Sequence, residues 1–415
     1  MKDIGIIGGG VAGLQLALSL QKDGIPATLY AERTPEQQRA CRLSNMVARN
    51  ACTRAREREL GVNHWDSQSH DMVRLAMTVR GPRSFSFSGR MMSPAHAVDM
   101  RIYWARLLED FASGGGSVVI HTVQASELDS LASQHELVVV ASGRASLSAL
   151  FPRVPEHSPF TAPQRLATAA LYRGIAYSEP RALEVFVNPG HGEILAVPYV
   201  SFEPGLTGIG ILGTGQGAFA SLRHVRYDDD PRAFCRSVLA ILREYAPSLF
   251  ERIDAARFDL ARPSDLGYAA ITPTVRRGFT ALSKGRYAVA LGDAHIVIDP
   301  ITGQGANNAS HAAAVLSAAI RNSQTFDRAF CERVETAICS HSVPVSDAAN
   351  ARLMPPEPHF RELLAAASRH QAVADLYANG YNDPEGFWAI ASSADRTAEF
   401  LGSVRAESTI VPAAN

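Results

Sequence analysis

The chain has 415 residues, of which 46% are hydrophobic and 20% charged, and its formal net charge is −1. This composition is typical of a soluble globular protein and excludes a strongly basic surface for nucleic acid, while no apolar run approaches the ~18 residues of a membrane span. The five cysteines show no CxxC pair and no metal-ligand spacing, so we expect reduced thiols, no metal site and a cytoplasmic protein.

The first elements along the chain are predicted to be a strand, a glycine-rich turn and a helix. Residues 6 and 7 lead straight into a G-x-G-x-x-G segment at positions 8–13, and an apolar stretch follows at 14–20. In such a turn the first glycine allows a tight bend, the second lets backbone approach a pyrophosphate, and the third lets helix pack on strand. We therefore expect a dinucleotide on this helix N-terminus, in a site that includes Gly8, Gly10, Val11, Ala12 and Gly13.

A second strand, predicted at 27–30, ends near Glu32, which lies 19 residues after Gly13. A carboxylate at this spacing is placed to accept hydrogen bonds from a ribose hydroxyl. Glu32 and its neighbour Arg33 are therefore included in the expected cofactor site. A glycine-rich turn without a ligand is the alternative, and the combination of strand, glycines, helix and acid disfavours it.

The remaining elements indicate an α/β fold with an inserted sheet. A helix is predicted at 98–112, and short strands at 118–122 and 137–141. Alternating apolar residues between 165 and 215 predict an antiparallel sheet, an amphipathic helix follows at 231–245, and a buried strand lies at 287–291. The chain after 305 reads as mostly helical.

This order predicts three parts. The first is a dinucleotide-binding domain made of residues 1–160 and 265–340, with part of 45–100 contributing to the second. The second is a β-rich substrate domain at 161–264, and the third is a helical C-terminal region at 341–415. A cleft between domains is a usual place for a ligand.

The strand at 287–291 ends in Gly292-Asp293, and a loop with the pattern Pro-x-x-Gly-x-Gly-x-Asn follows at 300–307. Asp293 is placed to accept from ribityl hydroxyls, and the glycines open a helix whose N-terminus can stabilise negative charge on a reduced flavin. The expected cofactor residues of this second half are Asp293, Pro300, Gly303, Gly305, Ala306 and Asn307.

Together the two glycine motifs resemble those of the flavoprotein monooxygenases of the aromatic-hydroxylase superfamily, which bind FAD. Within it, the chain most resembles the epoxidase component of two-component styrene and indole monooxygenases. The likeness runs almost end to end and is carried by segments at 42–50, 97–101, 189–193, 227–234 and 299–307. It implies a Rossmann-like FAD-binding domain with an inserted antiparallel β-sheet substrate domain and a helical C-terminal region.

One feature of the one-component hydroxylases is missing. They carry an Asp-Gly motif that serves FAD and NAD(P)H, whereas the matching strand end here reads Ser142-Gly143-Arg144. A second G-x-G-x-x-G at 208–213 lies among predicted strands with no helix after it, and we interpret it as a strand. The sequence therefore predicts an FAD site and no NAD(P)H site.

The resemblance then implies that an NAD(P)H-dependent flavin reductase, a transient partner, delivers reduced FAD. O2 adds at flavin C4a, and the hydroperoxide epoxidises a vinyl-aromatic or indole-type substrate. The sequence leaves the oligomeric state open, a homodimer included. A flavin oxidase or dehydrogenase, and a non-catalytic FAD-fold binding protein, are the alternative functions.

The resemblance also assigns residues to the reaction. Asn45 and Val47 match positions that face flavin and substrate, although Asn45 could equally cap a turn, and Pro300 stiffens the loop beside the flavin. Arg49, Met72, Leu75 and Ala95 are expected to line the substrate pocket, with ordinary core packing as the alternative for Met72, Leu75 and Ala95. Arg49 departs from the styrene-type pattern, which has histidine at this position. Arg42 and Arg101 are assigned to the FAD pyrophosphate, with a surface ion pair as the alternative for Arg42.

Overall fold

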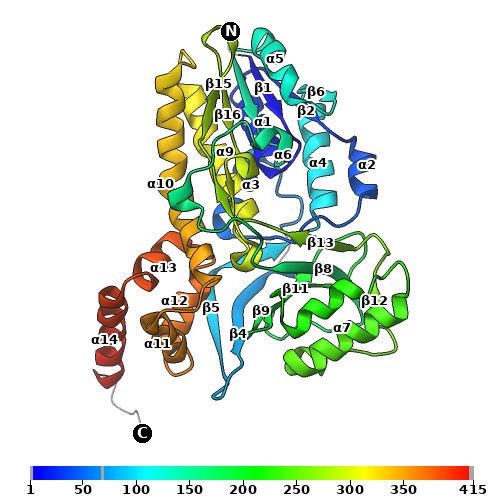
Figure 1. Ribbon diagram of the computed structural model, residues 1–415, viewed down its shortest axis with the longest axis vertical. Helices are drawn as coiled ribbons and strands as arrows, with labels where there is room; N and C mark the ends of the chain where they lie inside the picture. Colours follow the sequence, from blue (N-terminus) through cyan, green and yellow to red (C-terminus); the bar gives the residue numbers. More distant parts are fainter. Residues whose placement is uncertain (1–2, 67–69, 411–415) are drawn as a thin grey trace.

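Two sheets, one above the other in Figure 1, carry the fold in the computed structural model, which describes residues 3–66 and 70–410. Residues 1–2, 67–69 and 411–415, which fall within the expected domain ranges, lie outside the described residues. The upper sheet has the order β15-β16-β7-β1-β2-β6. Its strands are β1 (Ile4–Ile7), β2 (Ala27–Ala31), β6 (Ser117–Ile120), β7 (Leu137–Val140), β15 (Phe279–Ala281) and β16 (Tyr287–Ala290). All pairs except β15 with β16 are parallel, as a Rossmann-like sheet requires.

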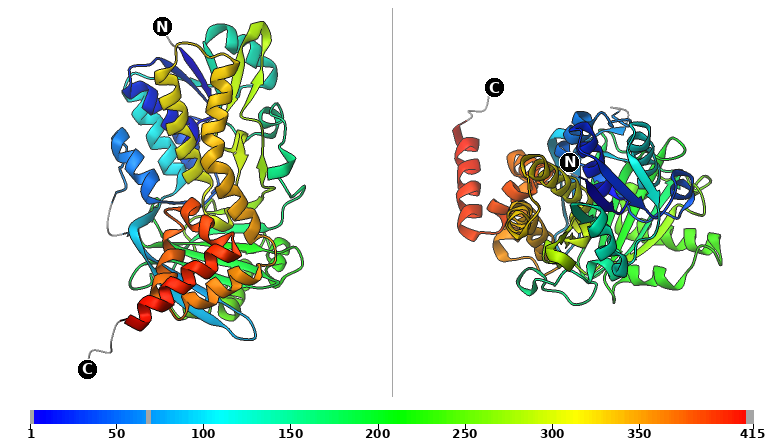
Figure 2. Two further views of the ribbon diagram at one scale, coloured as in Figure 1. Left: turned by 90° about the vertical axis from the view of Figure 1, so that its left-hand side faces the viewer. Right: turned by 90° about the horizontal axis from the view of Figure 1, so that it is seen from above.

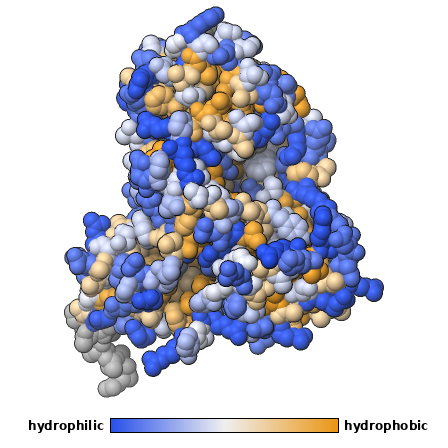
Figure 3. Space-filling view, viewed as in Figure 1, coloured by the Kyte–Doolittle hydropathy of each residue, from blue (hydrophilic) through white to orange (hydrophobic). Residues whose placement is uncertain are grey.

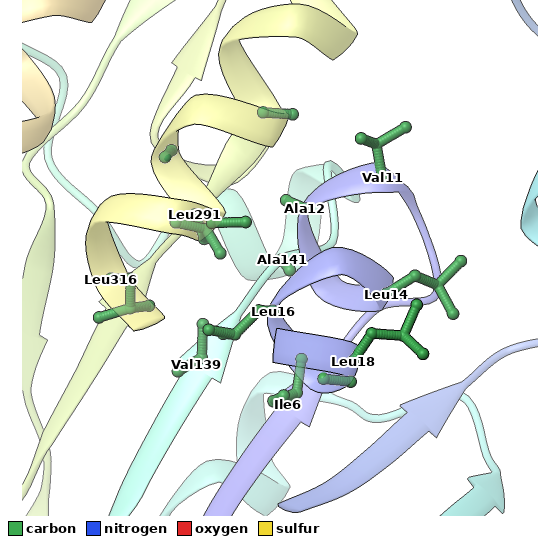
Figure 4. Packing of buried hydrophobic residues seen from close by; sticks show 14 of the residues in the cluster. Ile6, Val11, Ala12, Leu14, Leu16, Leu18, Val139, Ala141, Leu291 and Leu316 are labelled. Carbon is green, nitrogen blue, oxygen red and sulfur yellow. The ribbon is translucent and has the colours of Figure 1, made fainter. Parts of the chain in front are cut away.

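The upper sheet forms because its central strands are apolar throughout and helices cover them. All four residues of β1 and of β7 are buried. Figure 4 shows Leu16 of the first helix on the side of Ile6, Val139 and Leu316, which come from β1, β7 and the helix at 305–322, whereas Leu14 points to the other side of the first helix. The helices next to this sheet are α1 (Val11–Lys22), α4 (Met100–Ser113), α5 (Leu128–Gln134), α9 (Gly305–Asn322) and α10 (Arg328–Arg352).

The lower sheet has the order β12-β8-β11-β10-β9-β4-β5-β3, and β13 also pairs with β8. Strands β8 to β11 form the predicted antiparallel insertion, whereas β4 joins β9 in parallel. The bounds are β3 (Ala48–Arg49), β4 (Met72–Val79), β5 (Phe85–Ala97), β8 (Leu166–Arg173), β9 (Ala182–Asn188), β10 (Gly192–Tyr199), β11 (Leu206–Gly213), β12 (Asp259–Leu260) and β13 (Leu266–Ala270).

Four C-terminal helices lie beside the β4–β5 hairpin at the lower left of Figure 1, and the left view of Figure 2 shows them below α10. They are α11 (Pro358–Ala367), α12 (Gln371–Asn379), α13 (Pro384–Ala391) and α14 (Ala394–Ile410). Helix α12 meets β5 backbone to backbone at Gly89, where a Cβ would lie 1.9 Å from the Ala374 carbonyl oxygen. The predicted helical C-terminal region and the α/β class are confirmed.

The remaining elements are short connectors and one long helix. They are α2 (Pro35–Ala40), α3 (Ala51–Leu60), α6 (Ala145–Ser148), α7 (Pro231–Tyr245), α8 (Pro247–Phe250), β14 (Thr274–Val275) and β17 (Ile296–Val297). On the face in Figure 3, hydrophobic and hydrophilic residues are mixed over both halves of the molecule. None of the described helices combines the length and apolar character needed to cross a membrane.

Candidate active site

A cavity of about 1610 Å³ extends between the upper sheet, the lower sheet and the C-terminal helices. Its upper end is lined by the glycine turn before α1, the ends of β2 and β7, and the loop before α9. Its floor is one face of the lower sheet, and residues of α10 to α13 form a side wall. The cavity therefore joins the predicted cofactor motifs to an apolar chamber.

The glycine turn has the geometry that a pyrophosphate needs. Gly8 has a φ of +121°, which disfavours a side chain, and a Cβ on Gly13 would lie 1.9 Å from the Gly8 carbonyl oxygen. A Cβ on Gly10 would meet open space instead, because Gly10 faces the cavity. Gly8, Gly10, Val11 and Ala12 thus line the cavity, whereas Gly13 permits the turn to pack.

The acidic end of β2 also lies at the cavity. Glu32 and Arg33 both line it, and Arg144 makes an ion pair with Glu32 at 3.5 Å. Arg144 lines the cavity as well but was not predicted as a site residue. Its position in the sequence could have indicated this role, because Gly143 and Arg144 lie in the loop that follows the buried strand β7.

Asp293, which follows β16, lines the same cavity. It lies beside Gly143, where a Cβ would be 3.0 Å from the Asp293 Cβ. Although its surface opens onto the cavity, burial by the surrounding protein raises the pKa of its carboxyl, and Arg276 opposes the rise. A ligand hydroxyl here would find a hydrogen-bond acceptor.

The loop before α9 brings Pro300, Gly303, Gly305 and Ala306 to the cavity. Gly303 adopts a left-handed conformation with a φ of +63°. Asp299 fixes the turn by accepting a hydrogen bond from the Ile301 backbone N–H at 3.0 Å, and burial raises the pKa of Asp299 to about 6.

Asn307 is placed differently from the expectation that it binds the cofactor. It is 3% exposed and is not part of the cavity lining. Its amide oxygen accepts from the Asn50 backbone and the Thr53 hydroxyl, and its nitrogen donates to the Ala48 carbonyl at 3.1 Å. Asn307 therefore ties the start of α9 to the segment that carries Asn45 and Val47.

The segment Asn45–Ala48 lies in the middle of the cavity wall, with Asn45 exposed to it and Val47 partly buried. The intervening Met46 packs on the floor, because its sulfur lies 3.0 Å from where a Gly208 Cβ would be. Gly208 belongs to β11, as predicted for the second glycine motif. The structure thus places Asn45 and Val47 between the cofactor motifs and the floor.

The two arginines assigned to the pyrophosphate lie elsewhere. Arg42 is exposed and makes an ion pair with Asp228 at 2.8 Å, which was the alternative for it. Arg101 is buried between Asp99 and Asp265, at 2.5 and 2.6 Å, so its charge is balanced inside the protein. Neither side chain is part of the cavity lining, and neither faces the glycine turn.

Of the four expected pocket residues, only Leu75 lines the cavity. Met72 and Ala95 are fully buried in the core below, which was the alternative interpretation. Arg49 points into a buried polar network, where it pairs with Glu57 and contacts the His96 ring nitrogen at 2.7 Å. Met72 and Ala95 pair with each other across β4 and β5, and an irregularity in the register between Met72 and Arg74 separates them from the cavity-lining residues of β4.

Apart from Leu75, the apolar floor residues were not predicted from the sequence. They lie at alternating positions of β4, β9 and β10: Leu75, Met77, Val79, Leu183, Val185, Val187, Leu195 and Val197. The alternation was visible in the sequence, but not which face of the sheet would meet the cavity. Aromatic wall residues from α11 to α13 were missed because they lie more than 160 residues from the floor strands β4, β9 and β10 in the chain.

These features fit FAD. The first turns of α1 and α9 both border the cavity, and neither N-cap residue, Gly10 nor Gln304, supplies a side-chain hydrogen bond. The free N–H groups can therefore bind an anion. Glu32 and Asp293 line the cavity with carboxylates that can accept hydrogen bonds from ligand hydroxyls. Among the described residues, no cluster of three or more histidine, cysteine, aspartate or glutamate side chains could hold a metal, and all five cysteines are free.

Comparison with known proteins agrees with this site. Residues 143–252 match the family model "Styrene monooxygenase A putative substrate binding domain". The chain is 35% identical over 405 residues to the styrene monooxygenases StyA of Pseudomonas sp and Pseudomonas fluorescens, covering 96% of this chain and 97% of each relative.

Solved structures with the same fold are more distant in sequence. The flavin-dependent brominase Bmp2 is similar with a TM-score of 0.64 at 15% identity, covering 95% of this chain and 99% of that chain. The flavin-dependent halogenase CmlS is similar with a TM-score of 0.62 at 17% identity, covering 92% of this chain and 67% of that chain. With the StyA relatives matched almost end to end, the chain belongs to the styrene monooxygenase family and is a two-component flavoprotein monooxygenase that uses FAD and O2.

Proposed function

We propose that this protein epoxidises a vinyl-aromatic substrate of the styrene type, or an indole-type substrate, using FAD that a separate NAD(P)H-dependent reductase has already reduced. The observation that carries the proposal is the single cavity joining the cofactor motifs to an apolar chamber. Its relatives named for styrene match over nearly the whole chain.

When bound, reduced FAD supplies the oxygen-activating chemistry, which we propose proceeds with O2 through a C4a-hydroperoxide. The protein's own residues bind, orient and exclude water. The first turn of α1 and Glu32 hold the dinucleotide end, and Asp293 accepts from the ribityl chain. The N-terminus of α9 stabilises negative charge on the reduced ring.

Epoxidation adds an electrophilic oxygen to a π bond and needs no proton removed from the substrate. The apolar part of the cavity supports a reaction without proton removal, because its residues Val47, Leu75 and Leu183 present hydrocarbon side chains rather than a general base. We propose that Asn45, exposed in the cavity beside Val47, orients the flavin or substrate by hydrogen bonding. Pro300 holds the loop that carries the α9 N-terminus.

Stopped-flow mixing of the protein and reduced FAD with O2 tests the proposal. A long-lived absorbance band of the hydroperoxide, with epoxide formed from styrene or oxygenated product from indole, is expected. Flavin that reoxidises at once with release of hydrogen peroxide would contradict it.

Two rival functions have their own readouts. A flavin oxidase or dehydrogenase would bleach bound oxidised FAD when substrate is added without oxygen, and the oxygenase would not. A non-catalytic binding protein would fail to bind FAD in either redox state. Light scattering after size-exclusion chromatography would test whether the protein is a homodimer.

A further inference from the structure

The cavity continues past Leu75 into a part that the single-ring substrates do not need. Its floor consists of residue pairs facing one another across two parallel strands, because β4 and β9 are in register. The pairs are Leu75 with Leu183, Met77 with Val185, and Val79 with Val187. All six residues line the cavity, and we call this part of it the distal chamber.

The distal chamber runs along the strands, away from the segment that carries Asn45 and Val47. Ala48, at the end of that segment, pairs with Ala97 at one end of β5, whereas Val79 pairs with Phe85 at the other end. At ~3.4 Å per residue, Leu75 and Val79 are about 14 Å apart along the strand. This length exceeds that of one aromatic ring with a two-carbon substituent.

The opposite wall of the distal chamber is largely aromatic and comes from the C-terminal helices. Phe360 of α11, Tyr377 of α12 and Trp388 of α13 line the cavity, and the Tyr377 and Phe387 rings meet edge to face at 5.2 Å. Figure 1 shows these helices beside the β4–β5 hairpin.

The floor at the entrance to the distal chamber is well enclosed. Leu75, Met77 and Leu183 are 6%, 5% and 7% exposed. Among the charged residues of the helical wall, Glu357 and Arg361 lie at the start of α11, and the Arg352 guanidinium at the end of α10 stacks on the wall, 5.3 Å from the Phe387 ring centre. A neutral apolar group placed along the strands would thus be surrounded by hydrocarbon and rings, and would release water from both surfaces.

We propose that the preferred substrate is an elongated neutral molecule, an aryl alkene or thioether with a second ring in line with the reacting group. The second ring occupies the distal chamber, and the reacting group remains beside Asn45 and Val47. This inference rests on the proposed function for the reaction but concerns the shape of the substrate.

Two variants narrow the distal chamber from different strands: Val187→Phe on β9 and Val79→Phe on β4. Both add volume to an existing space, so the core need not rearrange. Val73→Phe is the matched control, because Val73 also lies on β4 but is 39% exposed and is not part of the cavity lining. Melting curves for the three proteins establish that each is folded.

Binding is measured first, with probes that cannot react, on protein saturated with FAD. Ethylbenzene has one ring and 4-ethylbiphenyl has two, and flavin absorbance reports their dissociation constants. We expect the wild type and Val73→Phe to bind 4-ethylbiphenyl at least about tenfold more tightly than ethylbenzene, as burial of one further ring predicts. In Val187→Phe and Val79→Phe the ratio of the two dissociation constants, ethylbenzene over 4-ethylbiphenyl, should fall by at least about fivefold. If all four proteins show the same ratio, the second ring binds elsewhere and the proposal is wrong.

Turnover is measured next with styrene and 4-vinylbiphenyl. We expect the two narrowing variants to lose at least about tenfold in kcat/KM for 4-vinylbiphenyl and less than about twofold for styrene. Equal losses for both substrates would overturn the proposal. If no protein oxygenates either alkene, the proposed function fails, whereas the binding ratio still decides whether the distal chamber takes a second ring.

Discussion

Gly10 and Gly13 are three residues apart, yet their missing side chains serve different purposes. A Cβ on Gly13 would collide with the Gly8 carbonyl, so that glycine is required by the fold. A Cβ on Gly10 would enter the open cavity, so we expect the ligand rather than the fold to require that glycine. The two roles can be separated by mutation.

Replacing Gly10 with valine should weaken FAD binding at least about 100-fold, because the side chain would occupy the space that a pyrophosphate needs. Titration of the variant with FAD, followed by protein fluorescence, measures the effect. Gly81→Val makes the same substitution at another glycine whose Cβ would meet open space, outside the cavity lining, and should leave FAD affinity unchanged. Equal affinity in wild type and Gly10→Val would show that the phosphates lie elsewhere.

Asp299 should make stability depend on pH. Burial raises the pKa of Asp299 to about 6 in the folded protein, above the ~3.9 of an unfolded chain. The folded state therefore binds more protons, and the stability linked to this group is present at low pH and lost as pH rises through about 6. As pH rises from 4 to 7, the free energy of unfolding of Asp299→Asn should increase by on the order of 2–3 kcal/mol relative to that of the wild type.

Denaturant unfolding of both proteins across this pH range checks the expectation. Asp229→Asn removes a charge at an exposed position and serves as the control. Parallel pH profiles for wild type and Asp299→Asn would contradict the argument.

At the scale of elements, the turn between α12 and α13 joins the C-terminal helices to the site. The Tyr381 hydroxyl donates to the Ala48 carbonyl, and the Tyr381 carbonyl accepts from the Gln304 amide at 2.9 Å. The Asn382 side chain accepts from the Ala51 backbone at 2.9 Å. The helices thus hold the segment that carries Asn45 and Val47 and the loop before α9 in a fixed relation.

Tyr381→Phe should therefore lower the yield of oxygenated product per reduced flavin by several-fold while costing only about 1 kcal/mol of stability. The reason is that the segment carrying Asn45 loses one of its anchors, and the site admits water more readily. Product and hydrogen peroxide are measured together in single-turnover experiments. Tyr177→Phe removes a comparable bond, to the Leu206 carbonyl at 3.1 Å, outside the cavity lining. An unchanged product yield in Tyr381→Phe, or an equal loss in Tyr177→Phe, would contradict this role.

Most elements were predictable from the sequence because their signals are local. The glycine turn and the buried strand at 137–141 needed only neighbouring residues. The predicted helix at 98–112 is found at Met100–Ser113. The pairing of Arg42 with Asp228 and of Arg101 with Asp265 was not predictable, because each partner is more than 160 residues away, whereas the other partner of Arg101, Asp99, is only two residues away.

At the scale of the whole molecule, FAD should couple the parts that line the cavity. The ligand would contact the turn before α1, the loop before α9 and Asp293, which come from distant parts of the chain. Ligand binding to the folded state at 100 times its Kd stabilises a protein by about 2.7 kcal/mol. We expect FAD to raise the melting temperature accordingly, and NADPH at the same concentration to leave it unchanged.

Scanning calorimetry with each nucleotide measures both effects. Gly10→Val should lose the stabilisation by FAD. A rise with NADPH in the wild type would point to a nicotinamide site and would contradict the prediction that the protein receives flavin already reduced.

The contact of Gly89 with the Ala374 carbonyl has a consequence for protein engineering. Where α12 meets β5, the two main chains are in direct contact. The distance between this helix and the sheet therefore cannot be changed by shortening a side chain at the contact. To change the substrate range, one would therefore vary the volumes of side chains that line the cavity, such as those at positions 79 and 187. Position 89 itself is closed to every residue but glycine.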